Sequence, residues 1–174
     1  MKLIVKGDTR SPISEAYRML RTNIQFTTLD SEEKILVITS AGMQEGKSTT
    51  VANLAFAIAE NDKKVLVIDC DMRRPMMHRI FTISNVEGLS NYLIGQSELD
   101  KVIFPIEKNL YVLPSGTIPP NPSELLGSQR MKDFLEKIKQ EYDYLLIDTP
   151  PVLAVTDAQI LSTLSNGVLH GRTK

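Results

Sequence analysis

The chain has little that would mark it for the cell exterior or for a membrane. It contains a single cysteine, Cys70, so no internal disulfide can form, which fits a reducing compartment. The apolar run near the N-terminus is only three residues long, too short for a signal peptide. No apolar run approaches the roughly 20 residues that span a bilayer. We therefore expect a cytoplasmic protein, which only a partner would recruit to the inner face of the cell membrane.

An excess of charge of one sign is also absent. The 20 Lys and Arg residues are balanced by 21 Asp and Glu residues, so the formal net charge at pH 7 is −1. A general nucleic-acid-binding surface is not indicated, because such surfaces are strongly basic. His78 and His170 do not have the spacing of a metal site. The length of 174 residues suits one domain with a sizeable core.

Short apolar runs alternate with amphipathic segments along the chain. The runs have the pattern of strands that are buried on both faces, and they lie at 34–40, 64–71, 109–116 and 143–151. Helical spacing of apolar residues is found at 11–27, 48–61 and 127–142, and again from 157. This alternation predicts an α/β fold, a mainly parallel sheet with helices on both faces. The run at 167–169 predicts the start of another strand, so we expect a fold that is truncated at its C-terminus.

A near match to the phosphate-binding loop G-x-x-x-x-G-K-[ST] lies between a predicted strand and a predicted helix. It has Ala41 where the first glycine is usual, which costs little if that residue has a negative φ. The backbone N–H groups of such loops cradle phosphate oxygens, Lys47 would reach the β- and γ-phosphates, and the Ser48 hydroxyl would ligate Mg²⁺. The alternative is a solvated loop with an incidental lysine. The expected nucleotide contacts are Ala41, Gly42, Gln44, Glu45, Gly46, Lys47, Ser48 and Thr49.

Carboxylates follow two other predicted strands. Asp69 and Asp71 end the run at 64–71, and Asp148 ends YLLID. Ligands of open α/β sheets bind at this edge, and carboxylates there suit a Mg²⁺–ATP complex and a hydroxyl that is to be activated. Each signal alone also fits a plain turn, but three on successive strands indicate a nucleotide site. Arg73 and Arg74 follow the second strand, where they could stabilise a phosphate or balance the local acid.

The first predicted helix carries E-x-x-R-x-x-R, formed by Glu15, Arg18 and Arg21. From the residues alone, the simplest interpretation is a solvated helix face with an ion pair of spacing i, i+3.

Four segments together resemble the cytoplasmic catalytic domain of bacterial tyrosine kinases of capsule and exopolysaccharide synthesis, which are P-loop NTPases related to the MinD and ParA ATPases. They are the loop 41–49, VLVIDCDMRRP (65–75), SGTIPPNPSELL (115–126) and LLIDTPPVLAVTDAQ (145–159). The resemblance extends from about Ser14 to Val168. MinD and ParA carry a second lysine where this chain has Gly42, so the likeness to them is looser.

The resemblance implies ATP and Mg²⁺ as cofactors and a role for each site residue. Lys47 and Ser48 would bind the phosphates, and Asp71, with Asp69 beside it, would help place Mg²⁺ and accept the tyrosine proton. Asp148 would complete a metal set with Ser48 and Asp71. The expected catalytic set is Asp71, Asp69 and Lys47.

The resemblance also implies an assembly and a partner. The helix with Glu15, Arg18 and Arg21, within residues 1–30, would build a ring of subunits around the nucleotide-binding core at 31–174. One subunit would phosphorylate the tyrosine tail of its neighbour, and the cytoplasmic tail of a transmembrane chain-length regulator would activate the enzyme. The family's tyrosine cluster and base-binding loop are not found in this sequence, and Met43 and Gln44 stand where Pro and Gly are usual.

Three functions follow. The first is an autophosphorylating, ATP-dependent protein-tyrosine kinase acting in capsular or exopolysaccharide synthesis and export. The second is a MinD-like ATPase switch that releases phosphate to water. The third is a truncated module that binds partners without turnover.

Overall fold

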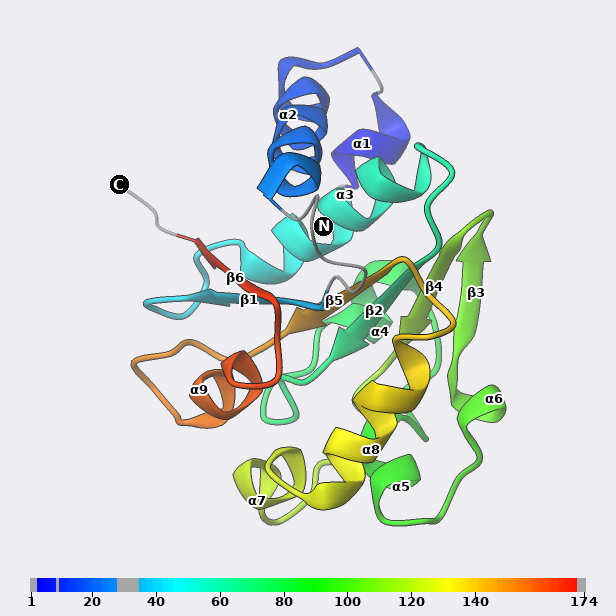
Figure 1. Cartoon of the computed structure of the whole chain (residues 1–174), viewed down its shortest axis with the longest axis vertical. Helices are drawn as coiled ribbons and strands as arrows, with labels where there is room; N and C mark the ends of the chain where they lie inside the picture. The colour runs from blue at the N-terminus through cyan, green and yellow to red at the C-terminus, as the bar shows by residue number, and fades with distance from the viewer. Residues whose placement is uncertain (1–2, 9, 28–34, 172–174) are drawn as a thin grey trace.

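The computed structural model describes residues 3–8, 10–27 and 35–171, which form one sheet covered by helices on both faces (Figure 1). The sheet has the strand order β3-β4-β2-β5-β1-β6. Its strands are β1 (Ile35–Ser40), β2 (Val65–Asp69), β3 (Phe104–Glu107), β4 (Leu110–Leu113), β5 (Tyr144–Asp148) and β6 (Gly167–Gly171). All neighbouring strands are parallel except β3, which pairs antiparallel with β4.

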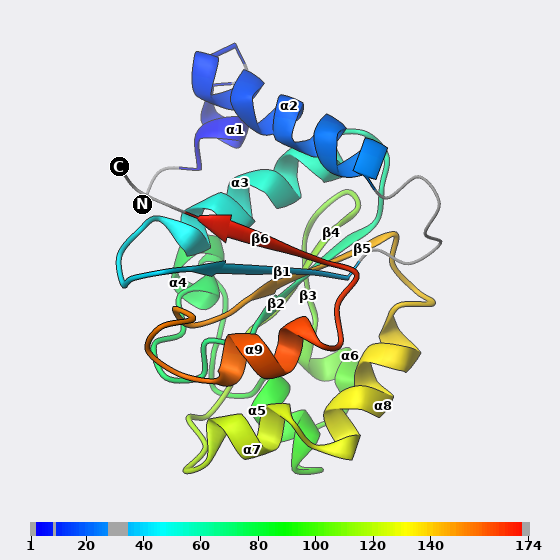
Figure 2. The same ribbon diagram turned by 60° about the vertical axis from the view of Figure 1, so that its left-hand side comes forward.

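Two layers of helices enclose the sheet, as Figures 1 and 2 show from two directions. On one face lie α1 (Ile4–Gly7), α2 (Pro12–Thr27), α3 (Lys47–Ala59) and α4 (Met77–Phe81). On the other face lie α5 (Leu89–Leu93), α6 (Leu99–Val102), α7 (Pro122–Leu126), α8 (Gln129–Ile138) and α9 (Asp157–Ser162). Because both faces are covered, every residue of β1, β2 and β5 is buried.

The strand order places the ends of β1, β2 and β5 side by side, although they are far apart in the sequence. Strand β5 pairs with both β1 and β2, so Ile38 and Asp69 both lie opposite Asp148. The segment after β5 is fastened to β1 by hydrogen bonds from Thr149 and Val152 to carbonyls of that strand. The carboxyl ends of the three strands therefore share one edge, where α/β sheets bind ligands.

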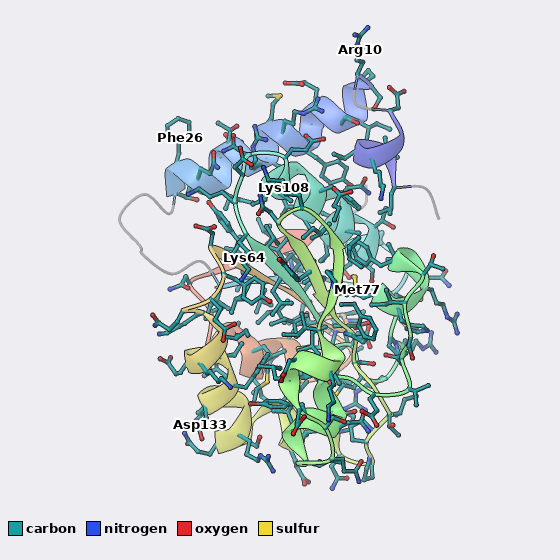
Figure 3. All side chains as sticks on the ribbon, turned by 90° about the vertical axis from the view of Figure 1, so that its right-hand side faces the viewer. Arg10, Phe26, Lys64, Met77, Lys108 and Asp133 are labelled. Carbon is teal, nitrogen blue, oxygen red and sulfur yellow. The ribbon has the colours of Figure 1, made fainter. Side chains whose placement is uncertain are left out.

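Helix α2 packs on α3 rather than on the sheet. The buried Ile24 joins the core cluster of α3. Asn53 of α3 accepts a hydrogen bond from the Val5 N–H at 3.1 Å, which ties α1 to the same helix. The outer side of α2 exposes apolar side chains, and Phe26, 67% exposed, points away from the fold near the end of the helix (Figure 3).

The long elements confirm the sequence prediction, while the short ones depart from it. The predicted parallel strands and the helices at 11–27, 48–61 and 127–142 are present with shorter bounds, and β6 continues the run at 167–169 to Gly171. The antiparallel edge strand β3 and the short helices α4 to α7 were not predicted. Among the described residues, no helix is long and apolar enough to cross a membrane.

Candidate functional site

The loop between β1 and α3 passes through two residues with positive φ. Gly46 precedes α3 with φ 77°, a left-handed conformation that glycine adopts freely. Gln44 has φ 62°, which costs a residue with a Cβ about 1 kcal/mol. Ala41 is not among the described residues with positive φ. An alanine was expected to be tolerated at position 41 if its φ is negative, and this condition is met.

The loop is held closed by its own side chains. The Gly42 N–H donates to the Glu45 carboxylate at 3.1 Å, and the Ser40 hydroxyl donates to the Gly42 carbonyl at 2.8 Å. The Glu45 carboxylate thus accepts a hydrogen bond from one of the loop N–H groups, and in such loops these groups bind phosphate oxygens.

Lys47, Ser48 and Asp148 form the centre of the site. The Lys47 Nζ lies 2.6 Å from Asp148 Oδ1 and 3.3 Å from the Ser48 hydroxyl, which itself donates to Asp148 Oδ2 at 2.7 Å. Asp71 Oδ2 lies 3.9 Å from the same Nζ. Lys47 is only 9% exposed and Asp148 is fully buried. The ammonium group of Lys47 is thus surrounded by Ser48 at the start of α3, Asp148 at the end of β5 and Asp71 in the loop after β2.

Asp69 and Asp71, predicted to act together, occupy different positions. Both oxygens of Asp69 accept backbone hydrogen bonds, from the N–H groups of Asp71, Met76 and Met77. Asp71 accepts one from the Arg74 N–H at 3.0 Å and also lines the cavity described below. The geometry therefore makes Asp69 the anchor of the loop after β2 and leaves Asp71 as the carboxylate that faces the cavity.

Burial raises the pKa of all three carboxyls of this edge. For Asp148, the Lys47 ammonium and the hydrogen bonds from Lys47 and Ser48 partly oppose the effect of burial. The pKa of Asp71 is raised by burial and lowered by Lys47 and by backbone N–H groups. The pKa of Asp69 is raised well above its ordinary value, by burial and then by the charge of Asp148. One lysine therefore does not compensate the buried acid, which favours the uptake of protons or of a further cation.

The donor set fits a magnesium ion. Mg²⁺ prefers oxygen ligands and is usually bound by one or two carboxylates together with phosphates and water. Ser48, Asp71 and Asp148, the expected metal ligands, supply a hydroxyl and two carboxylates that all contact the Lys47 ammonium. These residues would hold the ion, and the excess of negative charge would attract it.

A cavity of about 850 Å³ opens over this cluster. Its lining comes from the end of β1 with the loop that leads into α3, from the segment between β2 and α4 with part of α4, from the segment after β5, and from Asn85 and Ile118. Of the expected nucleotide contacts, Ala41 and Thr49 are not among the lining residues. The remaining loop residues and Asp71 all face the same space, whose volume suits a nucleotide.

Two residues of the site were not predicted from the sequence. Asp157 at the start of α9 is fully buried and binds Arg73, and Ser123 of α7 contacts both. Arg73 was noted beside the carboxylates, but its partner lies 84 residues away, so no local pattern could indicate the pair. Ser123 lies in the segment SGTIPPNPSELL, which supported the family resemblance but gave no predicted role to this serine.

The two arginines of the E-x-x-R-x-x-R motif of α2 make contacts within the chain. Arg18 binds Glu60, the residue directly after α3, at 3.3 Å. It also binds Glu15 at 3.5 Å, which is the ion pair of spacing i, i+3 that the residues alone predict. The Arg21 Nη1 donates to the Ala57 carbonyl at 2.9 Å. Glu15 remains 65% exposed. Within one chain the arginines therefore dock α2 on α3.

The tyrosines are poorly placed as phosphoryl acceptors. Tyr144 is buried in β5, and the other four tyrosines are partly buried. Tyr111 and Tyr142 pack edge to face beside Lys64. Burial raises the pKa of Tyr142 to about 12, which weakens it as a proton donor.

Comparison with known proteins gives consistent matches. A family model described as an AAA domain matches residues 33–170. Tyrosine-protein kinase YwqD of Bacillus subtilis is 46% identical over 166 residues, which cover 95% of this chain and 70% of that protein. Putative tyrosine-protein kinase CapB of Staphylococcus aureus is 41% identical over 163 residues, covering 93% and 72%. Tyrosine-protein kinase Etk of Escherichia coli is 47% identical over 148 residues, and the chain spans only 20% of its length.

Solved structures agree with these matches. The kinase domain of Escherichia coli tyrosine kinase ETK superposes with a TM-score of 0.94 at 41% identity, over 98% of this chain and 68% of that chain. The septum site-determining protein MinD of Pyrococcus horikoshii, complexed with Mg-ADP, gives a TM-score of 0.67 at 26% identity, over 79% and 57%.

Proposed function

The chain belongs to the bacterial tyrosine kinases of capsular and exopolysaccharide synthesis, a family with the P-loop NTPase fold, and from this membership we propose that it transfers the γ-phosphoryl group of Mg²⁺–ATP to a tyrosine hydroxyl. The observation that carries the proposal is the convergence of Lys47, Ser48, Asp71 and Asp148 at one edge of the sheet. We propose the same residues as the nucleotide and metal site.

Lys47 would leave its contact with Asp148 and stabilise the charge of the β- and γ-phosphates. Residues 42–48 of the loop line the cavity, and their N–H groups would bind phosphate oxygens, aided by the N-terminus of α3. Gly46 would allow the backbone to approach the nucleotide. Magnesium, when bound, would neutralise charge that develops on the phosphoryl group and its bridging oxygen.

Asp71 would accept the proton of the tyrosine hydroxyl. It faces the cavity, and its raised pKa makes its carboxylate a better base than an ordinary aspartate. Asp148 would hold Ser48 and the metal shell, while Asp69 would keep the loop after β2 in place. The transfer itself is an in-line displacement that needs positioning more than covalent help from the protein.

The acceptor tyrosine would come from outside the described fold. The half-buried or buried state of the chain's own tyrosines supports an acceptor on a neighbouring subunit or another protein. We propose a ring of subunits in which Glu15 and the outer face of α2 meet a neighbour, while Arg18 and Arg21 also hold α2 on α3. Activation by the cytoplasmic tail of a transmembrane chain-length regulator, at the inner face of the membrane, would place this activity in polysaccharide export.

The experiment that tests the function follows labelled phosphate from γ-labelled Mg²⁺–ATP. The full chain is incubated with a tyrosine-rich acceptor peptide, with and without the regulator tail, beside the variant Lys47→Met. Label on tyrosine that disappears in the variant supports the kinase. Free phosphate without labelled tyrosine supports the switch ATPase instead. No signal that depends on Lys47, from a protein with a cooperative unfolding transition, refutes both enzymes and leaves a binding module.

A further inference from the structure

Arg73 lines the cavity and also contacts a buried carboxylate that does not line it. It lies in the loop after β2 and lines the cavity with a side chain that is 41% exposed. Its Nε and Nη2 groups contact Asp157 Oδ2 at 3.2 Å and Oδ1 at 3.5 Å. Asp157, the first residue of α9, is fully buried. Two contacts from one planar guanidinium to one carboxylate fix its orientation as well as its position.

A hydroxyl from a third segment completes the arrangement. The Ser123 Oγ of α7 donates to Asp157 Oδ1 at 2.5 Å and accepts from Arg73 Nη2 at 3.1 Å. Helix α7 packs against α9, so both partners of the guanidinium belong to one packed unit. Arg73 is therefore held by two elements that do not themselves carry the phosphate-binding loop.

The Arg73 guanidinium still has N–H donors on Nη1 that a ligand could use. Among the described residues, no contact is made by its Nη1 group, while Nε and Nη2 are both used. The backbone beside it is also fixed, because Asp69 and Asp71 accept hydrogen bonds from N–H groups of the same loop. A cationic donor whose backbone and side chain are both fixed at a cavity edge can meet an anion without further ordering.

We propose that Arg73 binds a phosphate oxygen of the nucleotide, and that Asp157 and Ser123 are positioning residues that aim it. The inference rests on the proposed use of ATP by this site and adds three residues to it. A guanidinium present only to neutralise Asp157 would not need to lie in the wall of the same cavity as Lys47 and Asp71. The arrangement would also make the packing of α7 on α9 a determinant of nucleotide affinity.

The test is a double-mutant cycle on nucleotide binding. The probe is a fluorescent methylanthraniloyl-ATP with Mg²⁺, titrated into the full chain and into Arg73→Gln, Asp157→Asn and the double variant. Losing one charge-assisted phosphate contact should raise Kd about tenfold for Arg73→Gln. Asp157→Asn should raise Kd by a smaller factor in the parent chain and leave it unchanged in the Arg73→Gln background, because it acts through Arg73.

Controls separate this inference from the proposed function. Lys108→Gln breaks an exposed ion pair with Asp62 and should leave Kd unchanged. If Lys47→Met weakens binding but Arg73→Gln does not, the inference fails and the nucleotide site stands. If the parent chain does not bind the probe, or Lys47→Met binds it equally well, the proposed function fails.

Further outcomes address a merely structural role for Asp157. A lower melting temperature with an unchanged Kd would overturn the inference, as would an equal loss of affinity in both backgrounds. If Asp157→Asn does not fold, Ser123→Ala serves in its place, since Ser123 is only half buried. Ser123→Ala should raise Kd about two- to threefold in the parent chain, because it removes one neutral hydrogen bond, and should leave Kd unchanged in the Arg73→Gln background.

Discussion

Replacing Lys47 by methionine should destabilise the fold by an amount that depends on pH. The change removes the ammonium that lies 2.6 Å from the fully buried Asp148 and 3.9 Å from Asp71. A buried carboxylate that loses its partner is strongly unfavourable, typically by about 3–5 kcal/mol. The side chain of methionine is apolar and of similar length, so the loss of packing should be small.

Protonation of Asp148 sets an upper limit to this loss. Neutralising a carboxyl of ordinary pKa 3.8 at pH 7 costs about 4 kcal/mol, since each pH unit corresponds to about 1.4 kcal/mol. At pH 5 the same step costs only about 1.6 kcal/mol. We therefore expect Lys47→Met to lower the free energy of unfolding by up to about 4 kcal/mol at pH 7 and by less than half of that at pH 5.

Urea unfolding of both proteins at pH 5, 6 and 7, without nucleotide or magnesium, measures this difference. The variant Lys47→Met/Asp148→Asn is the matched control, since it has no carboxylate to neutralise at position 148 and should show little dependence on pH. An equal loss of stability at pH 5 and pH 7 would refute the reasoning and place the effect in packing.

Three further predictions follow from the site and its supports. Because burial raises the pKa of Asp71 and Asp148, the folded chain keeps protons that the unfolded chain loses above pH 3.8. Its free energy of unfolding should therefore fall as pH rises above 3.8. Mg²⁺ should raise the melting temperature more at pH 8 than at pH 5, and equal shifts at the two pH values would contradict this. Gln44→Gly should stabilise the chain by about 1 kcal/mol in urea unfolding by relieving a left-handed φ of 62°, whereas Gln44→Ala should not. Arg21→Leu should cost about 1 kcal/mol through its lost bond to Ala57, while Glu15→Ala should leave stability unchanged and shift only the oligomer distribution measured by sedimentation.

Features that depend on local patterns could be predicted from the sequence. The strands β1, β2 and β5 are unbroken apolar runs because both faces of the sheet are covered, so they stand out without any knowledge of their partners. The loop that ends at Ser48 is recognisable because backbone geometry fixes its glycine and lysine positions. The carboxylates could be predicted to meet because the ends of parallel strands share an edge.

Features that depend on distant contacts could not be predicted. Asp69 and Asp71 have equivalent places in the sequence, but only the path of the loop to Met77 decides that Asp69 binds backbone N–H groups. The partner of Arg73 is likewise set by how α9 packs. Short helices such as α5 contain too few residues to show a period, so tertiary packing determines them.

The order of the strands has a consequence for how the molecule forms. Strand β1 pairs with β5 and β6, segments more than 100 residues further along the chain, and the contact of Lys47 with Asp148 has a sequence separation of 101. Pairings of such high contact order form slowly, because the entropy of closing a long loop is lost before any contact stabilises the pair. On a ribosome, the phosphate-binding loop emerges long before the carboxylate that compensates its lysine. The cluster of Lys47, Ser48, Asp71 and Asp148 can thus form only after synthesis has passed β5, and the same holds for the proposed metal site.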